Sequence, residues 1–374
     1  MAQETRVYLD HAASSPVLPA VWDAMAEAMG VPGNPSSLHT SGRSMRRLLE
    51  QARESVAADL GSRPGEVVFC SGGTEANNLA VLGAAGPDGE VLVSAVEHPS
   101  VVEARRVLGD RVRVLPVDDA GRVDPATVAT AIGPATRLVS VMWVNNETGV
   151  VQPVGGIAAV ARRAGVLAHS DAVQAVGHLP VDFGASGLDL LSLSGHKLGG
   201  PVGIGALLVR RGVELRAPGF GGGQEAKLRS GTVPVVLAVG LAAALRIATG
   251  RLAAEAARLT ALGEQLRAGL EALPGARVNT TAPATPAVLH VTFEGVRADD
   301  LLLLLDAVGI DCSTGSACTA GVHQPSEVLL AMGRDLADAS GSLRFSFGPT
   351  TAASGIARLL EVLPGALASA RAAY

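Results

Sequence analysis

"EVVFCSGGTEANNLAVLGAAG" (66–86) joins a short apolar run, a glycine turn and an alanine-rich stretch. The run EVVFC (66–70) is continuously apolar, which is typical of a strand buried on both faces. The stretch TEANNLAVLGAAG (74–86) has the composition of a helix. A buried strand followed by a helix is the repeating unit of α/β folds, so this segment predicts a mainly parallel sheet.

The same unit recurs up to about residue 210. Six further apolar runs predict strands at 90–95, 111–117, 137–144, 165–170, 188–194 and 204–210. A second helix is predicted at 154–165, between two of these runs. We therefore expect a seven-stranded, mainly parallel sheet covered by helices on both faces. In such sheets, ligands bind beyond the carboxyl ends of the strands.

The pattern changes after about residue 234. A long helical stretch runs to about residue 272 and ends before Pro274–Gly275. Beyond it, AVLHVTFEG (287–295) and SLRFSFG (342–348) alternate like half-buried antiparallel strands, with a helix predicted at 299–309 between them. These elements predict a smaller α+β domain. We place the large α/β domain at 15–255 and form the small domain from 1–14 and 256–374.

Composition limits the class of protein. The hydrophobic fraction of 48% provides a core, and the net charge of −5 with scattered arginines argues against a nucleic-acid or anionic membrane surface. The apolar stretch 233–250 contains Pro234 and Arg246, so a buried helix is favoured over a membrane span. Three cysteines do not form a disulfide framework and no signal peptide is visible, which predicts a cytoplasmic protein.

Polar residues follow the predicted strands at the edge where ligands bind. They are Thr74, His98, Asn146, Asp171, Gln174 and Lys197, and Gly73 lies directly before Thr74 in a glycine turn. Each has a structural alternative: Thr74 and Asp171 as helix N-caps, Asn146 as a turn residue. None is specific alone, and the information lies in their order along the chain.

Lys197 is one of only two lysines in a chain that otherwise uses arginine, and it lies among small residues in SGHKLGG (194–200). A lysine amine forms a Schiff base with an aldehyde, which arginine cannot do, and a carboxylate such as Asp171 can keep a pyridine nitrogen protonated. A phosphate-binding glycine turn followed by a histidine, an asparagine, an aspartate and a lysine predicts a pyridoxal phosphate (PLP) site.

The three cysteines have different surroundings. CSTGSACTAG (312–321) consists almost wholly of small residues, which predicts an exposed, mobile loop in the small domain with Cys318 as an accessible, reactive thiol. Cys70 ends an apolar strand and is expected to be buried. Cys312 is either buried or a resolving thiol. The spacing of Cys312, Cys318 and His323 matches no common zinc site, so no metal is expected.

With these motifs the chain closely resembles the cysteine desulfurases of the NifS/IscS type, in the class V aminotransferase group with PLP fold type I. The resemblance covers nearly the whole chain. It is carried by YLDHAASSPV (8–17), GNPSSLH (33–39), SGGTEANN (71–78), EHPSV (97–101), MWVNNETGVVQPV (142–154), HSDAVQAVG (169–177), LSGHKLGGPVGIGAL (193–207), GGGQEAKLRSGT (221–232), TGSACTAG (314–321) and SLRFSFG (342–348).

The resemblance implies PLP as cofactor, and it implies roles around the cofactor ring. Lys197 would attach to PLP, Asp171 would pair with the pyridine nitrogen, and Gln174 would bond the ring hydroxyl. His98 would stack on the ring and take part in proton transfer. The phosphate would be held by Gly73, Thr74, Ser194, His196 and, from the partner subunit of a homodimer, Thr232.

The resemblance also implies the reaction. Asn146 and Arg344 would bind the carboxylate of L-cysteine, Asn146 also lying beside the cofactor, and Cys318 would be the nucleophile that takes the sulfur as a persulfide. TAGVHQPSEVLLAM (319–332) matches the long-loop group, in which the persulfide can reach a sulfur-acceptor or scaffold protein. Iron–sulfur cluster assembly and thio-modification are both compatible. The alternatives are a selenocysteine lyase, another class V enzyme and a non-catalytic scaffold.

Overall fold

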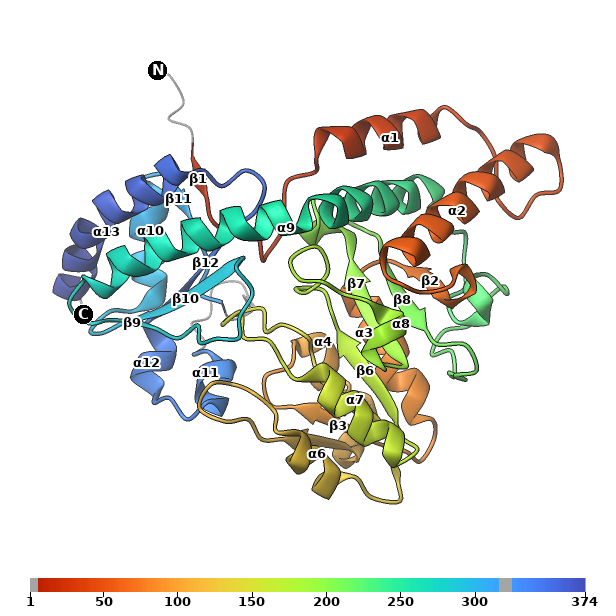
Figure 1. The fold of residues 1–374 in the computed structure, drawn as a ribbon, viewed down its shortest axis with the longest axis horizontal. Helices are drawn as coiled ribbons and strands as arrows, with labels where there is room; N and C mark the ends of the chain where they lie inside the picture. Colours follow the sequence, from red (N-terminus) through yellow and green to blue (C-terminus); the bar gives the residue numbers. More distant parts are fainter. Residues whose placement is uncertain (1–5, 316–324, 374) are drawn as a thin grey trace.

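The computed structural model describes residues 6–315 and 325–373. All seven predicted strands are present and form one sheet in the order β2-β8-β7-β6-β5-β3-β4 (Figure 1). Their bounds are β2 Val67–Cys70, β3 Glu90–Ser94, β4 Val112–Leu115, β5 Thr136–Ser140, β6 Leu167–Asp171, β7 Leu190–Ser194 and β8 Gly205–Val209. Only β8 is antiparallel to its neighbours in this sheet. The mainly parallel sheet is therefore confirmed.

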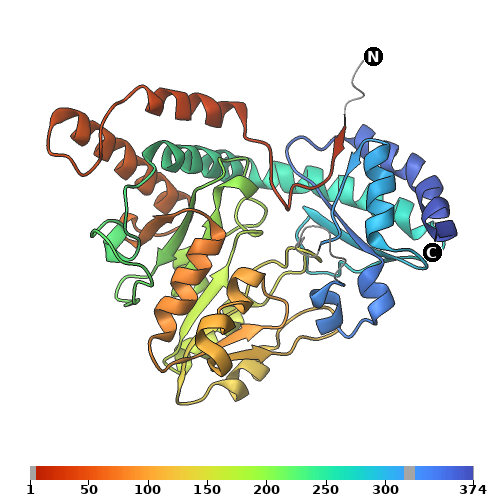
Figure 2. The ribbon, with the colours of Figure 1, turned by 180° about the vertical axis from the view of Figure 1, so that it is seen from behind.

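Helices cover both faces of the large sheet, which explains its continuous apolar strands. One face packs against α3 (Gly73–Ala85), seen in front of the sheet in Figure 2. The other packs against α2 (Thr40–Asp59), α7 (Val154–Arg163) and the first half of α9 (Val235–Glu271). Because neighbouring strand residues point to opposite faces, Val68 and Cys70 join the α3 core while Val67 and Phe69 join the other.

Short helices complete the covering layers and the connections between strands. They are α4 (Pro99–Val102), α5 (Arg105–Leu108), α6 (Pro125–Ala131), α8 (Phe183–Ser186), α11 (Glu327–Ala331) and α12 (Leu336–Ser340). The helix α1 (Pro19–Met29) packs along α9.

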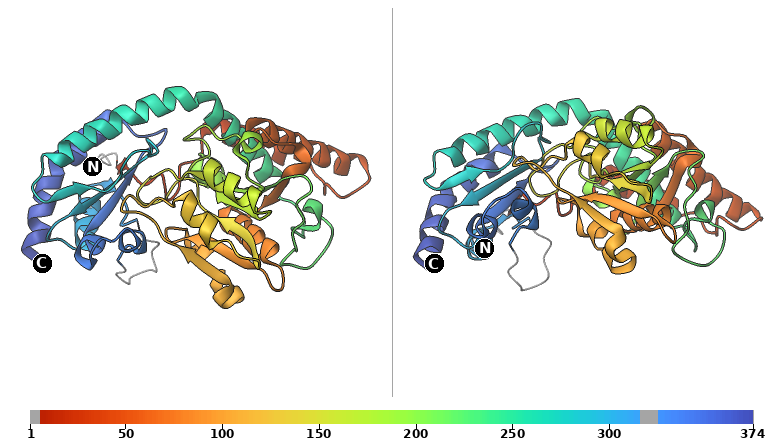
Figure 3. Two further views of the ribbon diagram at one scale, coloured as in Figure 1. Left: turned by 60° about the horizontal axis from the view of Figure 1, so that its bottom comes forward. Right: turned by 90° about the horizontal axis from the view of Figure 1, so that it is seen from below.

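The long helix α9 arches over both sheets (Figure 3). By length and composition alone it could cross a membrane. Its contacts are those of the core helix expected from the sequence: Leu241 and Leu245 pack in the core of the large sheet, and Leu259 and Leu266 pack in the core of the small one. The boundary placed at residue 255 falls within this helix and stays a prediction.

The small sheet consists of β12 (Ser342–Ser346), β10 (Val288–Phe293) and β9 (Ala276–Val278), all antiparallel. The helices α10 (Ala298–Ala307) and α13 (Ala353–Ala373) pack in its apolar core. The strand β1 (Val7–Tyr8) pairs in parallel with β11 (Ile310–Asp311), which brings the start of the described chain beside the small sheet.

The expectation that β10 and β12 are half-buried is wrong, because every residue of both strands is buried. The face that carries Val288 and His290 meets the turn of the large domain at Gly149 and the backbone at Gly315. The alternation in the sequence therefore marks a polar interior between two domains and not a solvent-facing surface.

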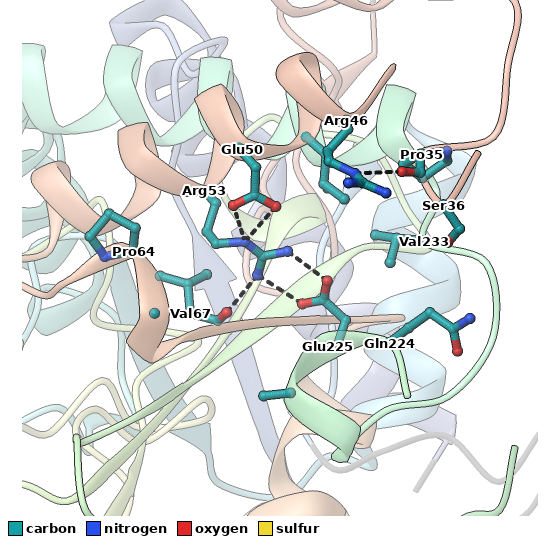
Figure 4. A pocket seen from close by; sticks show the side chains of 13 residues that line it. Pro35, Ser36, Arg46, Glu50, Arg53, Pro64, Val67, Gln224, Glu225 and Val233 are labelled. Carbon is teal, nitrogen blue, oxygen red and sulfur yellow. Dashed lines mark hydrogen bonds and ion pairs between the residues drawn. The ribbon is translucent and has the colours of Figure 1, made fainter. Parts of the chain in front are cut away.

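A buried ion pair holds the loop between β8 and α9. Within this loop, Glu225, Ala226 and Lys227 all have positive φ angles of 43°, 55° and 65°, a conformation that costs about 1–2 kcal/mol for each such residue. The Glu225 carboxylate accepts two bonds from Arg53 of α2, at 2.6 and 2.9 Å, and one from the Phe69 backbone at 2.7 Å (Figure 4). The pair borders a cavity of about 390 Å³.

Replacing Arg53 by methionine tests this anchor. The Glu225 side chain is only 2% exposed, so Arg53→Met leaves a buried carboxylate without its cation and should lower the free energy of unfolding by about 3–5 kcal/mol. Chemical denaturation measures the change. The matched control is Arg358→Met, which removes an exposed pair with Glu361 and should cost no more than about 0.5 kcal/mol. Equal losses in the two variants would contradict the anchor.

Candidate active site

The candidate site lies at one edge of the large sheet. The strands β2, β3, β5, β6 and β7 run in the same direction, so their carboxyl ends meet at this edge. In the loops that follow these ends, or at the ends themselves, lie Gly73, His98, Asn146, Asp171 and Lys197. The edge faces β12 of the small sheet, which carries Arg344.

Lys197 lies in the turn Gly195–Lys197 that follows β7. Its amine donates hydrogen bonds to the backbone oxygens of Ala12 and Ala13, the second at 3.0 Å. Burial and the nearby positive charge of Arg344 lower the pKa of Lys197 to about 8, while Asp10 and Asp171 oppose this effect. A large part of the amine is therefore neutral, and so nucleophilic, at mildly alkaline pH.

Asp171 ends β6 and is 7% exposed. One carboxylate oxygen accepts from Asn77 of α3 at 2.6 Å, and the other accepts from the Val173 backbone at 2.9 Å. Gln174, one turn further on, donates to the Ala12 oxygen at 3.0 Å. The sequence analysis missed Asn77, although it lies in the quoted SGGTEANN; only the packing of α3 against the sheet brings it to Asp171.

His98 begins α4 after β3. Its Nδ1 accepts from the Ser100 backbone N–H at 3.1 Å, so a neutral ring carries its proton on Nε2. Burial lowers the pKa of His98, and the charge of Lys197 lowers it further while Asp171 raises it. At neutral pH the His98 imidazole is therefore neutral, and its Nδ1 accepts the hydrogen bond from the Ser100 backbone.

Two of the predicted phosphate residues, Gly73 and Ser194, lie close together at the start of α3: a Cβ atom at Gly73 would lie 3.7 Å from the Cβ of Ser194. Gly72 precedes this helix and no side chain caps it, so the alternative of Thr74 as N-cap is wrong. The Ser194 hydroxyl is buried and has no hydrogen-bond partner among the described residues. A Cβ atom at Gly72 would lie only 3.7 Å from that hydroxyl. Free N–H groups at a helix start and an unpartnered buried hydroxyl suit an anion.

Two further predicted phosphate residues differ in their placement. His196 lies 3.4 Å from the Ser14 hydroxyl, and burial lowers its pKa to about 4, so it is neutral at physiological pH. Thr232 is exposed in the loop before α9, and no hydrogen bond recorded within 6–315 and 325–373 joins it to Ser194 or Gly73 of the same chain.

Arg344 is 4% exposed and lies between the two domains. Its Nη1 donates to the Asn146 backbone oxygen at 2.9 Å, and its Nη2 pairs with Asp10 at 2.8 Å. Its Nε is buried and has no partner in the described part of the chain. The predicted neighbours Asn146 and Arg344 are thus brought together. Asp10 was missed, although it lies in the quoted YLDHAASSPV.

The two cysteines among the described residues, Cys70 and Cys312, both have raised thiol pKa values. Cys70 is 2% exposed, and burial raises its pKa to about 12. Burial also raises the pKa of Cys312, so both thiols are held in the unreactive protonated form. Cys318 and His323 lie outside the described residues, and within these no cluster of three or more His, Cys, Asp and Glu side chains could hold a metal ion.

The reactivity of Lys197 should follow its lowered pKa. In protein freed of cofactor, the rate of amine acylation at Lys197 should rise with pH, reach half its maximum near pH 8 and then level off, because only the neutral amine reacts. An unperturbed lysine titrates near ~10.4. Mass spectrometry after brief labelling at each pH, with N-acetyl-lysine as reference, measures the profile. A Lys197 profile that coincides with the reference would refute the lowered pKa.

Comparison with known proteins gives a consistent result. The sequence profile of the family described as Aminotransferase class-V matches residues 7–359. An IscS-like cysteine desulfurase of Mycobacterium tuberculosis is 49% identical, the match covering 98% of this chain and 97% of the relative. The chain has a fold similar to that of a NifS-like protein, with a TM-score of 0.90 at 33% identity, over 98% of this chain and 100% of that one.

A third similar structure is described as SspA in complex with cysteine. It matches with a TM-score of 0.81 and 34% identity, covering 92% of this chain and all of that one. The family match, over residues 7–359, spans both sheets. The chain therefore belongs to the class V aminotransferases, and within them to the cysteine desulfurases of the NifS/IscS type.

Proposed function

We propose that this chain is a PLP-dependent cysteine desulfurase that converts L-cysteine to L-alanine. Its sulfur is captured as a persulfide on Cys318 and passed to acceptor or scaffold proteins for iron–sulfur cluster assembly or thio-modification. The observation that carries the proposal is one juxtaposition: the low-pKa amine of Lys197, the buried carboxylate of Asp171 and the unpartnered Ser194 hydroxyl share a strand edge that faces Arg344.

The residues present fit PLP. When bound, PLP supplies an aldehyde for covalent attachment and an electron sink for the pair released at the substrate Cα. Lys197 would attach it, Asp171 would pair with its ring nitrogen, and Gln174 would bond its ring hydroxyl. The start of α3, Ser194 and His196 would hold its phosphate. Asn77 donates to Asp171 at 2.6 Å and so keeps that carboxylate oriented.

Arg344 would bind the carboxylate of L-cysteine. Asn146 and Asp10 already take its two terminal nitrogens and hold the guanidinium in place, while its buried Nε has no partner in the described residues. A charge-assisted bond to the substrate carboxylate would satisfy this donor. The half-buried Asn146 side chain would lie beside the same carboxylate.

Proton transfer would fall to Lys197 and His98. Because the pKa of Lys197 is lowered to about 8, part of its amine is neutral and could accept the proton from the substrate Cα. The Cys318 thiolate would attack the substrate sulfur, forming a sulfur–sulfur bond as the carbon–sulfur bond breaks. The electron pair of that bond stays on the substrate carbon, which takes up a proton to give alanine. One thiol and one cysteine thus yield one persulfide and one alanine.

A substitution at Cys318 separates cofactor chemistry from sulfur capture. Cys318→Ala should retain bound PLP and its visible absorbance but form no persulfide, because the accepting sulfur is gone. Persulfide-specific alkylation with mass spectrometry, together with an alanine assay lacking any keto-acid acceptor, measures both. Lys197→Ala is the converse control and should lose covalent PLP. Wild-type persulfide transfer by Cys318→Ala would overturn the assignment of the nucleophile.

We also propose that the chain forms a homodimer. Large apolar side chains are exposed on α1 and on two loops: Trp22 (57%), Met29 (65%), Leu38 (81%) and Phe220 (fully exposed). The helix α1, the loop after it and the loop before α9 lie at the same end of the molecule (Figure 1). A large exposed apolar area is typical of a subunit interface, and Thr232 lies in one of these loops.

Mixed dimers test whether Thr232 acts on the partner's site. Thr232→Ala should weaken PLP binding, and Lys197→Ala should be inactive. In a dimer that pairs the two variants, one site combines an intact Lys197 from one chain with an intact Thr232 from the other. Mixed dimers isolated by co-expression with two different affinity tags should therefore be more active at limiting PLP than either variant alone. Mixed dimers with no restored activity would place Thr232 outside the partner's site.

A further inference from the structure

Glu147 is a buried acidic residue to which the mechanism gives no role. It lies in the turn after β5, beside Asn146, and is 7% exposed. Its Oε2 accepts a hydrogen bond of 2.6 Å from the Ser326 hydroxyl. Ser326 is 1% exposed, and the same hydroxyl accepts from the Leu329 backbone at 3.1 Å and so caps α11. Glu147 thus holds the start of a helix of the small domain.

The Glu147 side chain also lies beside the backbone at Gly315. A Cβ atom at Gly315 would lie 3.4 Å from both the Cγ and the Oε2 of Glu147, and 3.3 Å from the Nε2 of His290. The φ of Gly315 is +83°, which favours glycine as well. Gly315 and Ser326 flank the segment that carries Cys318. The side chain of Glu147 is therefore bonded to one end of that segment, at Ser326, and lies beside the other, at Gly315.

Other contacts tie these two ends to the substrate arginine and to the strand edge. Ser313 pairs with Arg344 through two backbone bonds of 2.7 and 3.2 Å, and Arg344 in turn donates to the oxygen of Asn146. Beyond Ser326, Val328 and Leu329 of α11 pack in one apolar cluster with Val96 and Met142 of the large domain. The neighbouring residues Asn146 and Glu147 thus hold Arg344 and the flanks of the Cys318 segment from a single turn.

We propose that Glu147 is a positioning residue for sulfur capture: its carboxylate ties the Ser326 flank of the Cys318 segment to the turn that holds Arg344 and lies beside the Gly315 flank. This inference rests on the proposed role of Cys318 as nucleophile. Glu147 touches neither cofactor nor substrate in this account. Its removal should slow the transfer of sulfur to Cys318 while leaving the attachment of PLP and the binding of L-cysteine intact.

Three variants test the geometry. Glu147→Ala and Ser326→Ala each remove the same hydrogen bond, and each should slow single-turnover persulfide formation on the order of tenfold or more, because misplacement of a reacting group is costly. Glu147→Gln should be largely rescued, since its amide oxygen still accepts from Ser326. PLP content, the visible spectral change on adding L-cysteine and the rate of persulfide formation are measured on the same dimeric holoenzyme.

A control variant separates this contact from the loss of a helix cap. Asp335 caps the neighbouring α12 by accepting from the Asp338 backbone at 2.8 Å, and Asp335→Ala leaves the Glu147–Ser326 bond in place. It should form persulfide at the wild-type rate. If Asp335→Ala is as slow as Ser326→Ala, cap loss explains the effect and the inference is wrong.

The remaining outcomes distinguish this inference from the proposed function. If Cys318→Ala still forms persulfide, the proposed nucleophile fails, whatever Glu147 does. If Cys318→Ala is inactive while Glu147→Ala and Ser326→Ala form persulfide at the wild-type rate, the positioning role is refuted. Loss of PLP or of the cysteine-induced spectral change in Glu147→Ala, or a glutamine variant as slow as alanine, would also overturn it. The inference would be established if Glu147→Ala forms persulfide slowly while keeping its PLP content and the cysteine-induced spectral change, and if Glu147→Gln restores the rate.

Discussion

The parallel direction of β2, β3, β5, β6 and β7 is the constraint on which the rest of the site depends. Parallel strands place all their carboxyl ends at one edge, so residues more than a hundred positions apart become neighbours. Gly73 after β2 and Ser194 at the end of β7 lie side by side for this reason, a Cβ atom at Gly73 being 3.7 Å from the Cβ of Ser194. Without the common edge, Lys197 would be an isolated lysine on a loop.

The second constraint is the short segment from Asp10 to Ala13, which runs between the two sheets. The backbone oxygen of Ala12 accepts hydrogen bonds from both Gln174 and Lys197. The backbone nitrogen of Ala12 donates to the Ser346 hydroxyl at 2.9 Å. Asp10 pairs with Arg344. This segment joins the cofactor edge to the strand that would bind substrate, so the geometry of both halves depends on residues near the chain start.

Burial and nearby charges set the protonation states of the side chains at this edge of the sheet. Burial and Arg344 lower the pKa of Lys197, while burial holds His98 and His196 neutral. The amine is nucleophilic because it lies where a second positive charge is unfavourable. The cysteines show the reverse effect, since burial raises the pKa values of Cys70 and Cys312 and keeps both thiols protonated.

The sequence by itself determined the seven strands and the order of the polar residues, because buried parallel strands have a local apolar signature. Its choice of Lys197 rests on the amine that a Schiff base needs, and it stays a prediction. The sequence also carried the family motifs, which assigned roles to Asp171, Arg344 and Cys318. The tertiary structure alone decided that Asn77 supports Asp171, that Asp10 neutralises Arg344, that β10 and β12 are fully buried, and that Glu147 meets Gly315 and Ser326. These contacts join residues far apart in the chain, and their formation depends on how helices and domains pack, which no local periodicity records.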